Sequence, residues 1–197
     1  MEFDFSDLFE SMNLSIEDYQ YLNQLLNHRT IVLNEEVSES IVEKVFLPLK
    51  EFEEDDNDAP ITLILNSVGG SVADGCFLAD YLTTYKKKLN ILVCGYACSM
   101  ATVILAAGGK NDNITRRCYP SSYSLIHDGY IALNATESKS ATDIISFNEQ
   151  VDSNIRKFII DHTNITPELF DSKARHQWFL SAKEMLELNL IDEIIGG

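Results

Sequence analysis

The most constraining feature of this sequence is a strand, a glycine-containing turn and a helix, which follow one another twice. The apolar run 61–65 leads through two adjacent glycines into the helical stretch 72–85. A second strand, 91–94, leads through an expected turn at 95–98 into a helix of about 99–107. Nearly continuous apolar strands that alternate with helices are typical of a buried parallel sheet. The sequence therefore predicts an α/β fold, in which polar residues at the strand ends are the place for a functional site.

The segments on either side extend this pattern. A strand at 123–126 ends at His127, and an amphipathic helix of about 137–162 is long enough to reach beyond the core of a small domain. Residues 1–18 are acidic with interspersed Phe and Leu, which favours an arm, so we expect one domain at 19–197. The other expected elements are helices at 19–27 and 38–52, a strand at 30–33, a solvated acidic loop at 51–58, a short helix after Thr166, and a last helix with a capping box at Ser181.

Charge and cysteine usage exclude several classes of function. The chain has 15 Lys and Arg against 31 Asp and Glu, a net charge of −16, so we expect no nucleic-acid partner. Residues 89–109 contain no charge, but Asn90, Gly95 and Ser99 dilute their hydrophobicity, so we expect no membrane span. The four cysteines form no metal-type CxxC pair, and acids stand where a signal peptide has bases. We therefore expect a cytoplasmic protein with free thiols, no metal and no bound cofactor.

Two polar side chains at strand ends could carry chemistry. Ser99 follows a strand and opens a helix, where helix-terminal amides favour the oxyanion that a serine nucleophile creates. The simpler interpretation is an N-cap, since Ser is favoured there, and the surrounding sequence is not the G-x-S-x-G motif. His127 ends the strand that follows in chain order, so it could serve as a general base on the same sheet edge. The other histidines, His28, His162 and His176, are interpreted as surface or helix-end residues.

The adjacent Gly69 and Gly70 allow a close approach of backbone amides to a ligand. They could form an oxyanion hole, a phosphate cradle or a plain tight turn. Cys76 stands where a P-loop requires Lys, and the sequence contains no G-x-G-x-x-G, so nucleotide binding is weakly supported.

Together these segments resemble the proteolytic subunit of the Clp protease. The resemblance runs from about residue 25 to 195, in the order and with the spacing of that family. Its motifs are a glycine segment (Asn66-Ser-Val-Gly-Gly-Ser71), a nucleophile segment (Gly95-Tyr-Ala-Cys-Ser-Met-Ala101, followed by Leu105-Ala-Ala-Gly108), a base segment (Ser124-Leu-Ile-His127) and a closing motif (Phe179-Leu-Ser-Ala182 with Leu190-Ile-Asp192).

The resemblance implies an α/β fold of the crotonase-like type, built from repeated β-β-α units with a protruding handle. That handle, a strand and a long helix at about 129–162, would interlock two rings. The resemblance further implies serine endopeptidase activity on unfolded polypeptides or peptides, inside a chamber made by two stacked heptameric rings. An AAA+ unfoldase is the implied partner.

By position, the resemblance makes Ser99 the nucleophile and His127 the base, with the amides of Gly70 and Met100 as the oxyanion hole. The family's third triad member, usually Asp, corresponds to Gln177, and Asp171 or Asp128 are alternatives for that role. Gln177 leaves open a second interpretation, a catalytically weak or silent subunit that assembles with active partners. A third, a crotonase-type enzyme acting on acyl-CoA thioesters, would have to rely on the carboxylates of Asp74 and Asp128.

Overall fold

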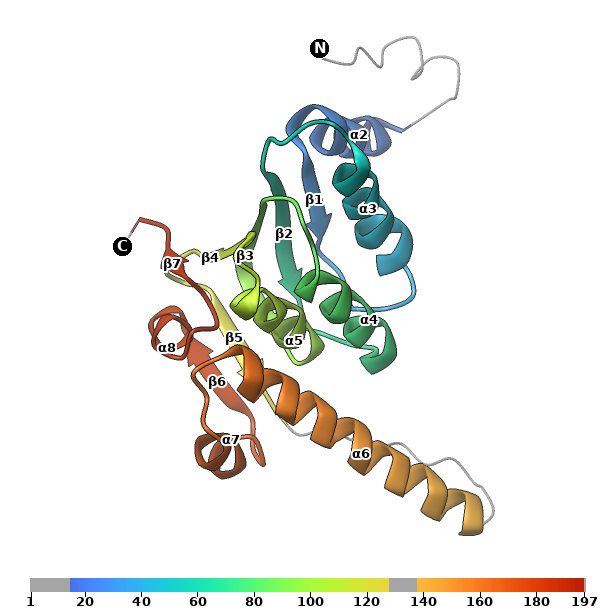
Figure 1. Ribbon diagram of the computed structural model, residues 1–197, viewed down its shortest axis with the longest axis vertical. Coiled ribbons are helices and arrows are strands. Elements are labelled where there is room, and N and C mark those ends of the chain that lie inside the picture. Colours follow the sequence, from blue (N-terminus) through green and yellow to red (C-terminus); the bar gives the residue numbers. More distant parts are fainter. Residues whose placement is uncertain (1–14, 128–137, 197) are drawn as a thin grey trace.

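Parallel strands form the centre of the protein in the computed structural model, which describes residues 15–127 and 138–196 (Figure 1). Their spatial order is β1 (Thr30–Leu33), β2 (Ile61–Ser67), β3 (Leu89–Cys98), β4 (Ile114–Cys118) and β7 (Glu193–Ile194). Each of these strands is parallel to its neighbour. This confirms the predicted α/β class with a parallel sheet.

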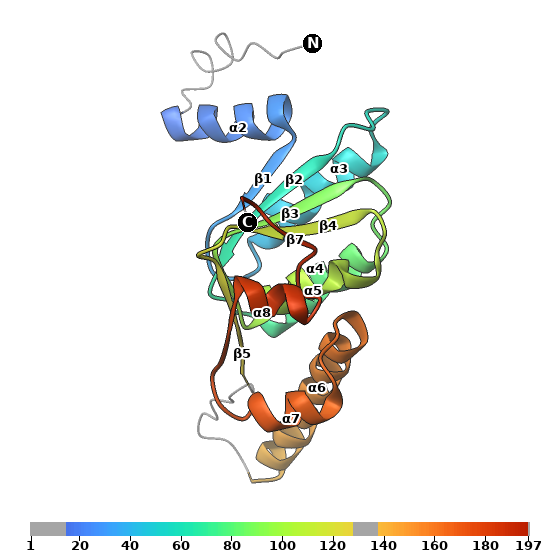
Figure 2. The same cartoon turned by 90° about the vertical axis from the view of Figure 1, so that its left-hand side faces the viewer.

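Two further strands and a set of helices complete the described part of the chain (Figures 1 and 2). Strand β5 (Tyr123–Ile126) pairs with β3 and with the antiparallel strand β6 (Trp178–Ser181). The helices are α2 (Ile16–His28), the π-helical turn η1 (Val42–Phe46), α3 (Leu47–Glu54), α4 (Val72–Thr83), α5 (Met100–Ala106), the 3-10 turn η2 (Ala107–Lys110), α6 (Ser138–His162), α7 (Pro167–Lys173) and α8 (Ala182–Glu187).

The prediction of a turn at 95–98 is wrong, because strand β3 continues to Cys98. The strand changes neighbour at this point: residues 89–93 pair with β4, whereas residues 96–98 pair with β5. Gly95 lies at the change with φ of 98°, and a Cβ there would be 2.7 Å from Asn66 Oδ1. The same Asn66 oxygen accepts from the backbone amide of Tyr96 at 3.3 Å, so the side chain of Asn66 bridges the bend. The bend directs β3 toward β5 and places Ser99 and His127 at one edge of the sheet.

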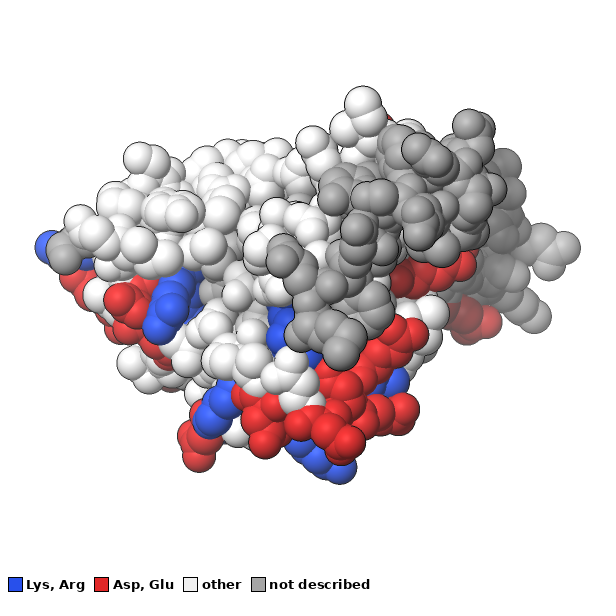
Figure 3. Space-filling model, turned by 90° about the horizontal axis from the view of Figure 1, so that it is seen from above, with Lys and Arg blue, Asp and Glu red and all other residues white. Residues whose placement is uncertain are grey.

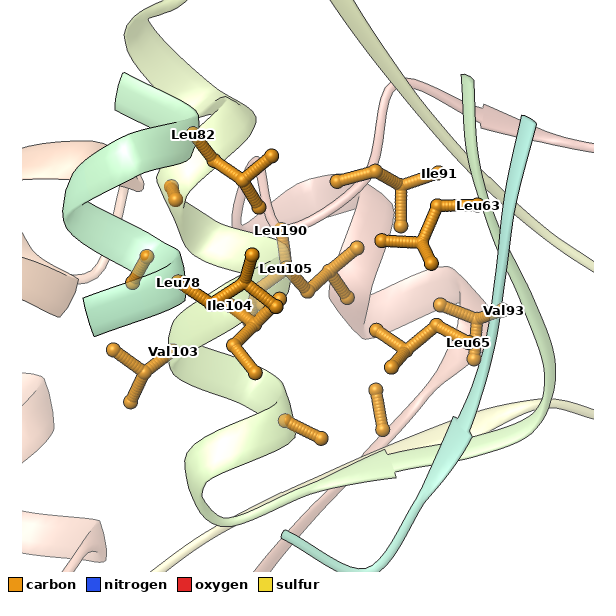
Figure 4. Close-up of a cluster of buried hydrophobic side chains, with 14 of the residues drawn as sticks. Leu63, Leu65, Leu78, Leu82, Ile91, Val93, Val103, Ile104, Leu105 and Leu190 are labelled. Carbon is orange, nitrogen blue, oxygen red and sulfur yellow. The ribbon is translucent and has the colours of Figure 1, made fainter. Parts of the chain in front are cut away.

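The core fixes where that edge lies. Figure 4 shows strand side chains that point toward leucines and isoleucines of α4 and α5. They include Leu63, Leu65, Ile91 and Val93 from β2 and β3, and Leu78, Leu82, Ile104 and Leu105 from the helices, all essentially without exposed surface. Full burial of each such side chain contributes about 1.5–3 kcal/mol to folding. Helix α5, which begins directly after Ser99, is therefore held firmly on the sheet.

An ion pair between a buried arginine and a partly exposed aspartate closes the C-terminal part of the fold. Arg116 on β4 is 1% exposed, and its Nη2 atom lies 2.6 Å from Asp192 Oδ1. The Arg116 backbone amide also donates to Asp192 Oδ2 at 2.6 Å, and Nη1 donates to the carbonyl oxygen of Asn189 at 2.8 Å. These bonds fix the segment between α8 and β7 against the sheet.

Helix α6 has 25 residues and extends away from the sheet (Figure 1), as its sequence pattern predicts. The strand expected at 129–135 lies outside the described residues, as do most of residues 1–18. Among the helices of the described ranges, none is long and apolar enough to cross a membrane.

Acidic side chains are unevenly distributed over the surface. Figure 3 shows them gathered in one area of the face drawn there, beside a broad uncharged area. The acidic run 51–58 is mostly exposed, as predicted, but its first half belongs to α3 rather than to a loop.

Candidate active site

Ser99 stands at the junction of β3 and α5 in a strained conformation. Its φ of 53° and ψ of −121° are rare for a residue with a side chain, and such backbone strain costs about 1–3 kcal/mol. Although Ser99 is the N-cap residue of α5, its side chain makes no capping hydrogen bond. The N-cap interpretation therefore does not explain the serine. A strained turn from strand to helix is the setting in which α/β-hydrolases expose a nucleophilic serine, and here it occurs without the G-x-S-x-G motif.

Buried hydroxyl groups hold this turn against β5. The hydroxyls of Thr102 and Ser124 lie 2.8 Å apart, and both reach the carbonyl oxygen of Ala97, at 2.8 and 2.7 Å. The amide of Ser99 donates to the carbonyl oxygen of Leu125 at 2.8 Å. These polar contacts fix the first turn of α5 relative to the strand that ends at His127. No sequence signal pointed to Thr102, and Ser124 was named only as the first residue of the base segment.

A cavity of about 260 Å³ brings Ser99 and His127 together. Both residues are half-buried, and the cavity is also lined by Met100 and by residues of α6 and α7. A hollow of about 460 Å³ lies alongside, between α4 and α6, and shares Val72, Val103 and Ile155 with it. Gly70 and Gln177 are not among the lining residues of the cavity.

The two backbone amides expected to form the oxyanion hole, those of Met100 and Gly70, lie in different surroundings. The amide of Met100 is the first of helix α5, and the first amides of a helix have no partner within it. Gly70 forms a parallel bridge with Val37, in which the Val37 amide donates to Gly69 O and the Ser71 amide donates to Val37 O, both at 2.8 Å. In a parallel pairing of this kind, the Gly70 amide itself points away from Val37.

Glycine is required at positions 69 and 70 for different reasons. A Cβ on Gly69 would lie 2.7 Å from Met100 N and 2.8 Å from Ser99 Cβ. A Cβ on Gly70 would lie 2.3 Å from Val37 O. Close approach to the serine turn thus requires glycine at position 69, whereas at position 70 the requirement comes from the neighbouring chain at Val37.

Gln177 is placed by the pairing of β5 with β6. Ile126 faces Trp178 in this antiparallel pair, so the register, continued by one residue, sets His127 beside Gln177. Gln177 is exposed. A glutamine carbonyl can accept a hydrogen bond from an imidazole N–H, although it carries no charge.

The carboxylates that the sequence offered as alternatives lie in different places. Asp171 lines the cavity, but its two oxygens accept from Arg156 Nε and Nη2 at 2.7 and 2.8 Å. This hydrogen bonding lowers the pKa of Asp171. Asp74 lies in the first turn of α4 and is not among the cavity residues. Asp128 lies outside the described residues.

Three charged residues of the cavity wall were not predicted from the sequence: Asp152, Arg156 and Arg175. A signal for two of them was available. Asp152 and Arg156 recur at helical spacing with Ile155 and Ile159, and all four line the cavity. Charged residues that interrupt the apolar face of an amphipathic helix therefore indicate the part of α6 that lines the cavity.

One comparison with known proteins identifies a relationship. The model of the family described as Clp protease matches residues 14–197, a range that includes every residue of the site discussed above.

Proposed function

This chain belongs to the Clp protease family, and from that premise we propose that it is a serine endopeptidase with Ser99 as the nucleophile. The observation that carries the proposal is the conformation of Ser99. A strained serine without a capping role opens helix α5 and shares a cavity with His127. Backbone strain of this kind clusters at active sites and ligand-binding positions.

The proposed reaction follows from these positions. His127 takes the proton of the Ser99 hydroxyl while Ser99 Oγ forms a bond to the carbonyl carbon of a peptide. The electron pair of the C=O bond moves to oxygen, and the amides of Gly70 and Met100 stabilise that oxyanion. His127 then gives its proton to the leaving nitrogen as the C–N bond breaks. Water, activated by His127, hydrolyses the acyl-enzyme and restores Ser99.

Gln177 sets the expected rate. Its side-chain oxygen can fix the ring of His127 but cannot stabilise the imidazolium by charge. The change of Asp to Asn in a serine-protease triad lowers kcat by about 10⁴. We therefore propose a slow peptidase. The second candidate is a silent subunit that assembles with active partners, and the neutral, exposed side chain of Gln177 favours it.

The assembly belongs to the same proposal. Two stacked heptameric rings of crotonase-like subunits would enclose the active sites, the segment 129–162 would join the rings, and an AAA+ unfoldase would deliver unfolded polypeptides. Exposed apolar side chains on the projecting part of α6 support an assembly through this helix; they include Ile144, Ile145 and Phe147, the last 65% exposed. Sedimentation of the purified protein tests it, because a monomer at all concentrations would contradict the rings.

Labelling with a fluorophosphonate probe tests the nucleophile. We expect the label on Ser99, located by peptide mass spectrometry, and none in the Ser99→Ala variant. Ser153 provides an internal control, because it is the other serine of the same cavity wall. Label on Ser153, or equal labelling of the Ser99→Ala protein, would contradict the assignment of Ser99.

A further inference from the structure

An ion pair forms part of the wall of the catalytic cavity and joins two helices. Arg156 on α6 and Asp171 on α7 make two parallel hydrogen bonds, at 2.7 and 2.8 Å. The guanidinium carbon of Arg156 also lies 5.8 Å from the centre of the Phe170 ring. Both charged residues line the same cavity as Ser99 and His127. This two-pronged geometry fixes direction as well as distance between the helices.

Helix α7 leads directly to the residue beside the proposed base. Phe170 in α7 and Ala174 directly after it are buried, and three residues after Ala174 the chain reaches Gln177. Strand β6 then begins at Trp178, opposite Ile126. The position of α7 on α6 therefore constrains Gln177 from its N-terminal side, while the pairing of β6 with β5 constrains it from the other.

Stability alone gives this pair little reason to exist. The side chains of Arg156 and Asp171 are 35% and 54% exposed. Exposed ion pairs contribute little to folding, because water screens them and two long side chains must be ordered. Two-pronged geometry can raise that contribution, so the variants below are compared in Tm as well as in rate. The place of the pair in the wall of the cavity points to a positioning role.

We propose that Arg156 and Asp171 are a positioning pair, which holds α7 on α6 so that Gln177 and His127 stay aligned with Ser99. The inference rests on the proposed function, since it concerns the reactivity of the same serine. Neither residue takes part in the bond changes.

A double-mutant cycle tests the pair. The variants are Arg156→Met, which keeps the apolar stem, Asp171→Asn, which keeps the shape, and the two combined. Their second-order rate constants for fluorophosphonate labelling of Ser99 are compared with wild type between pH 5 and 9, together with Tm. We expect each single variant to react about 10-fold more slowly, because small misplacements of reacting groups are costly. The combined variant should lose no more than either single one, and Tm should change little.

Two further variants sharpen the result. Arg156→Lys keeps the charge but cannot form the two-pronged contact, so it should recover only part of the rate. Lys157→Met is the matched control. Lys157 follows Arg156 on the same helix, pairs with Asp161 one turn further on, and is not among the residues that line the cavity. This variant should react like wild type.

The outcomes separate the two claims. Single variants that react as fast as wild type overturn the positioning pair while the proposed function stands. Losses that multiply in the combined variant also overturn it, because the two residues would then act independently. A wild-type protein that stays unlabelled overturns the proposed function, and the inference with it.

Discussion

Gly69 is the residue on which the geometry of Ser99 depends most closely. Its φ of 90° is already unfavourable for any residue with a side chain. In addition, the missing Cβ leaves room for backbone atoms of Cys98 and Met100, which a substitution would meet at 2.5 and 2.7 Å. Backbone atoms inside a packed turn cannot move away cheaply, so a side chain at position 69 must displace the serine turn.

Gly69→Ala should therefore lower both stability and reactivity. We expect a loss of at least about 2 kcal/mol in the free energy of unfolding, from the positive φ together with the overlap. Labelling of Ser99 should slow by about 100-fold. Gly196→Ala is the matched control, because Gly196 also has a positive φ, of 77°, but a Cβ there meets nothing within 4 Å. Equal labelling of the two variants would contradict the role of Gly69.

Gln177→Asp tests the third member of the proposed triad. A carboxylate beside His127 would stabilise the imidazolium that forms during attack, which a neutral amide cannot do. We expect Ser99 to react with the fluorophosphonate about 100-fold faster or more, up to the limit of about 10⁴ set by the comparable triad change. A rate unchanged within twofold would mean that Gln177 does not contact the base.

Strand β3 shows what could and could not be predicted at the level of secondary structure. The first half of β3, the helices that begin near residues 72 and 100, and the capping box at Ser181 were predictable, since each depends on local sequence. The second half of β3 was not, because Gly95 looks like a turn residue unless its bridge to Asn66 is known. The short strands β4, β6 and β7 were not predicted, because each is defined by pairing with a strand that is distant in sequence.

The candidate site divides in the same way. Ser99 and His127 could be named because each follows an apolar strand. The strain at Ser99 could not, since it results from the close approach of Gly69 and from the hydroxyl contacts of Thr102 and Ser124. The pair of Arg156 and Asp171 needed the packing of α7 on α6, which no local pattern encodes.

The ion pair between Arg116 and Asp192, which fixes the C-terminal segment, gives a prediction of stability. The adjacent pair of Arg117 and Glu193 provides the control. Asp192→Asn leaves the charge of Arg116, only 2% exposed in its side chain, without an anionic partner. Removing the partner of a buried charge costs about 3–5 kcal/mol, and the 37% exposure of the Asp192 side chain places the expected loss at the lower end of that range. Glu193→Gln breaks the next pair, Arg117 with Glu193, whose side chains are 40% and 55% exposed, and should cost less than about 1 kcal/mol. Denaturant unfolding measures both; similar losses would contradict the difference in burial.

Taken over the full chain, several buried weak acids make the fold sensitive to alkaline pH. Burial raises the pKa of Cys118 to about 11. Burial also raises the pKa of Tyr81 and Tyr85, whose hydroxyls donate to Glu53 and to the carbonyl oxygen of Leu49. In the unfolded chain these groups ionise at their ordinary values, near 8.5 for Cys and 10 for Tyr. Their contribution to stability is complete below about pH 8.5 and is lost as the pH rises through the folded pKa values.

We therefore expect the free energy of unfolding to fall between about pH 9 and 11. Guanidinium titrations at several pH values measure it, and absorbance at 295 nm follows the tyrosines. Cys118→Ala should make the fall in the free energy of unfolding shallower near pH 9, where it begins. Tyr85→Phe should make the fall shallower toward pH 11. A flat profile up to pH 11 would show that these groups ionise freely in the native protein.

Cleavage of an unfolded polypeptide tests the central claim most directly. The purified protein is incubated with a permanently unfolded substrate, and new termini are identified by mass spectrometry, beside the Ser99→Ala variant. We predict slow cleavage by the wild type, faster cleavage by Gln177→Asp, and none by Ser99→Ala. If the wild type and Gln177→Asp both leave the substrate intact, or if Ser99→Ala cleaves it equally well, Ser99 is not the nucleophile of a peptidase.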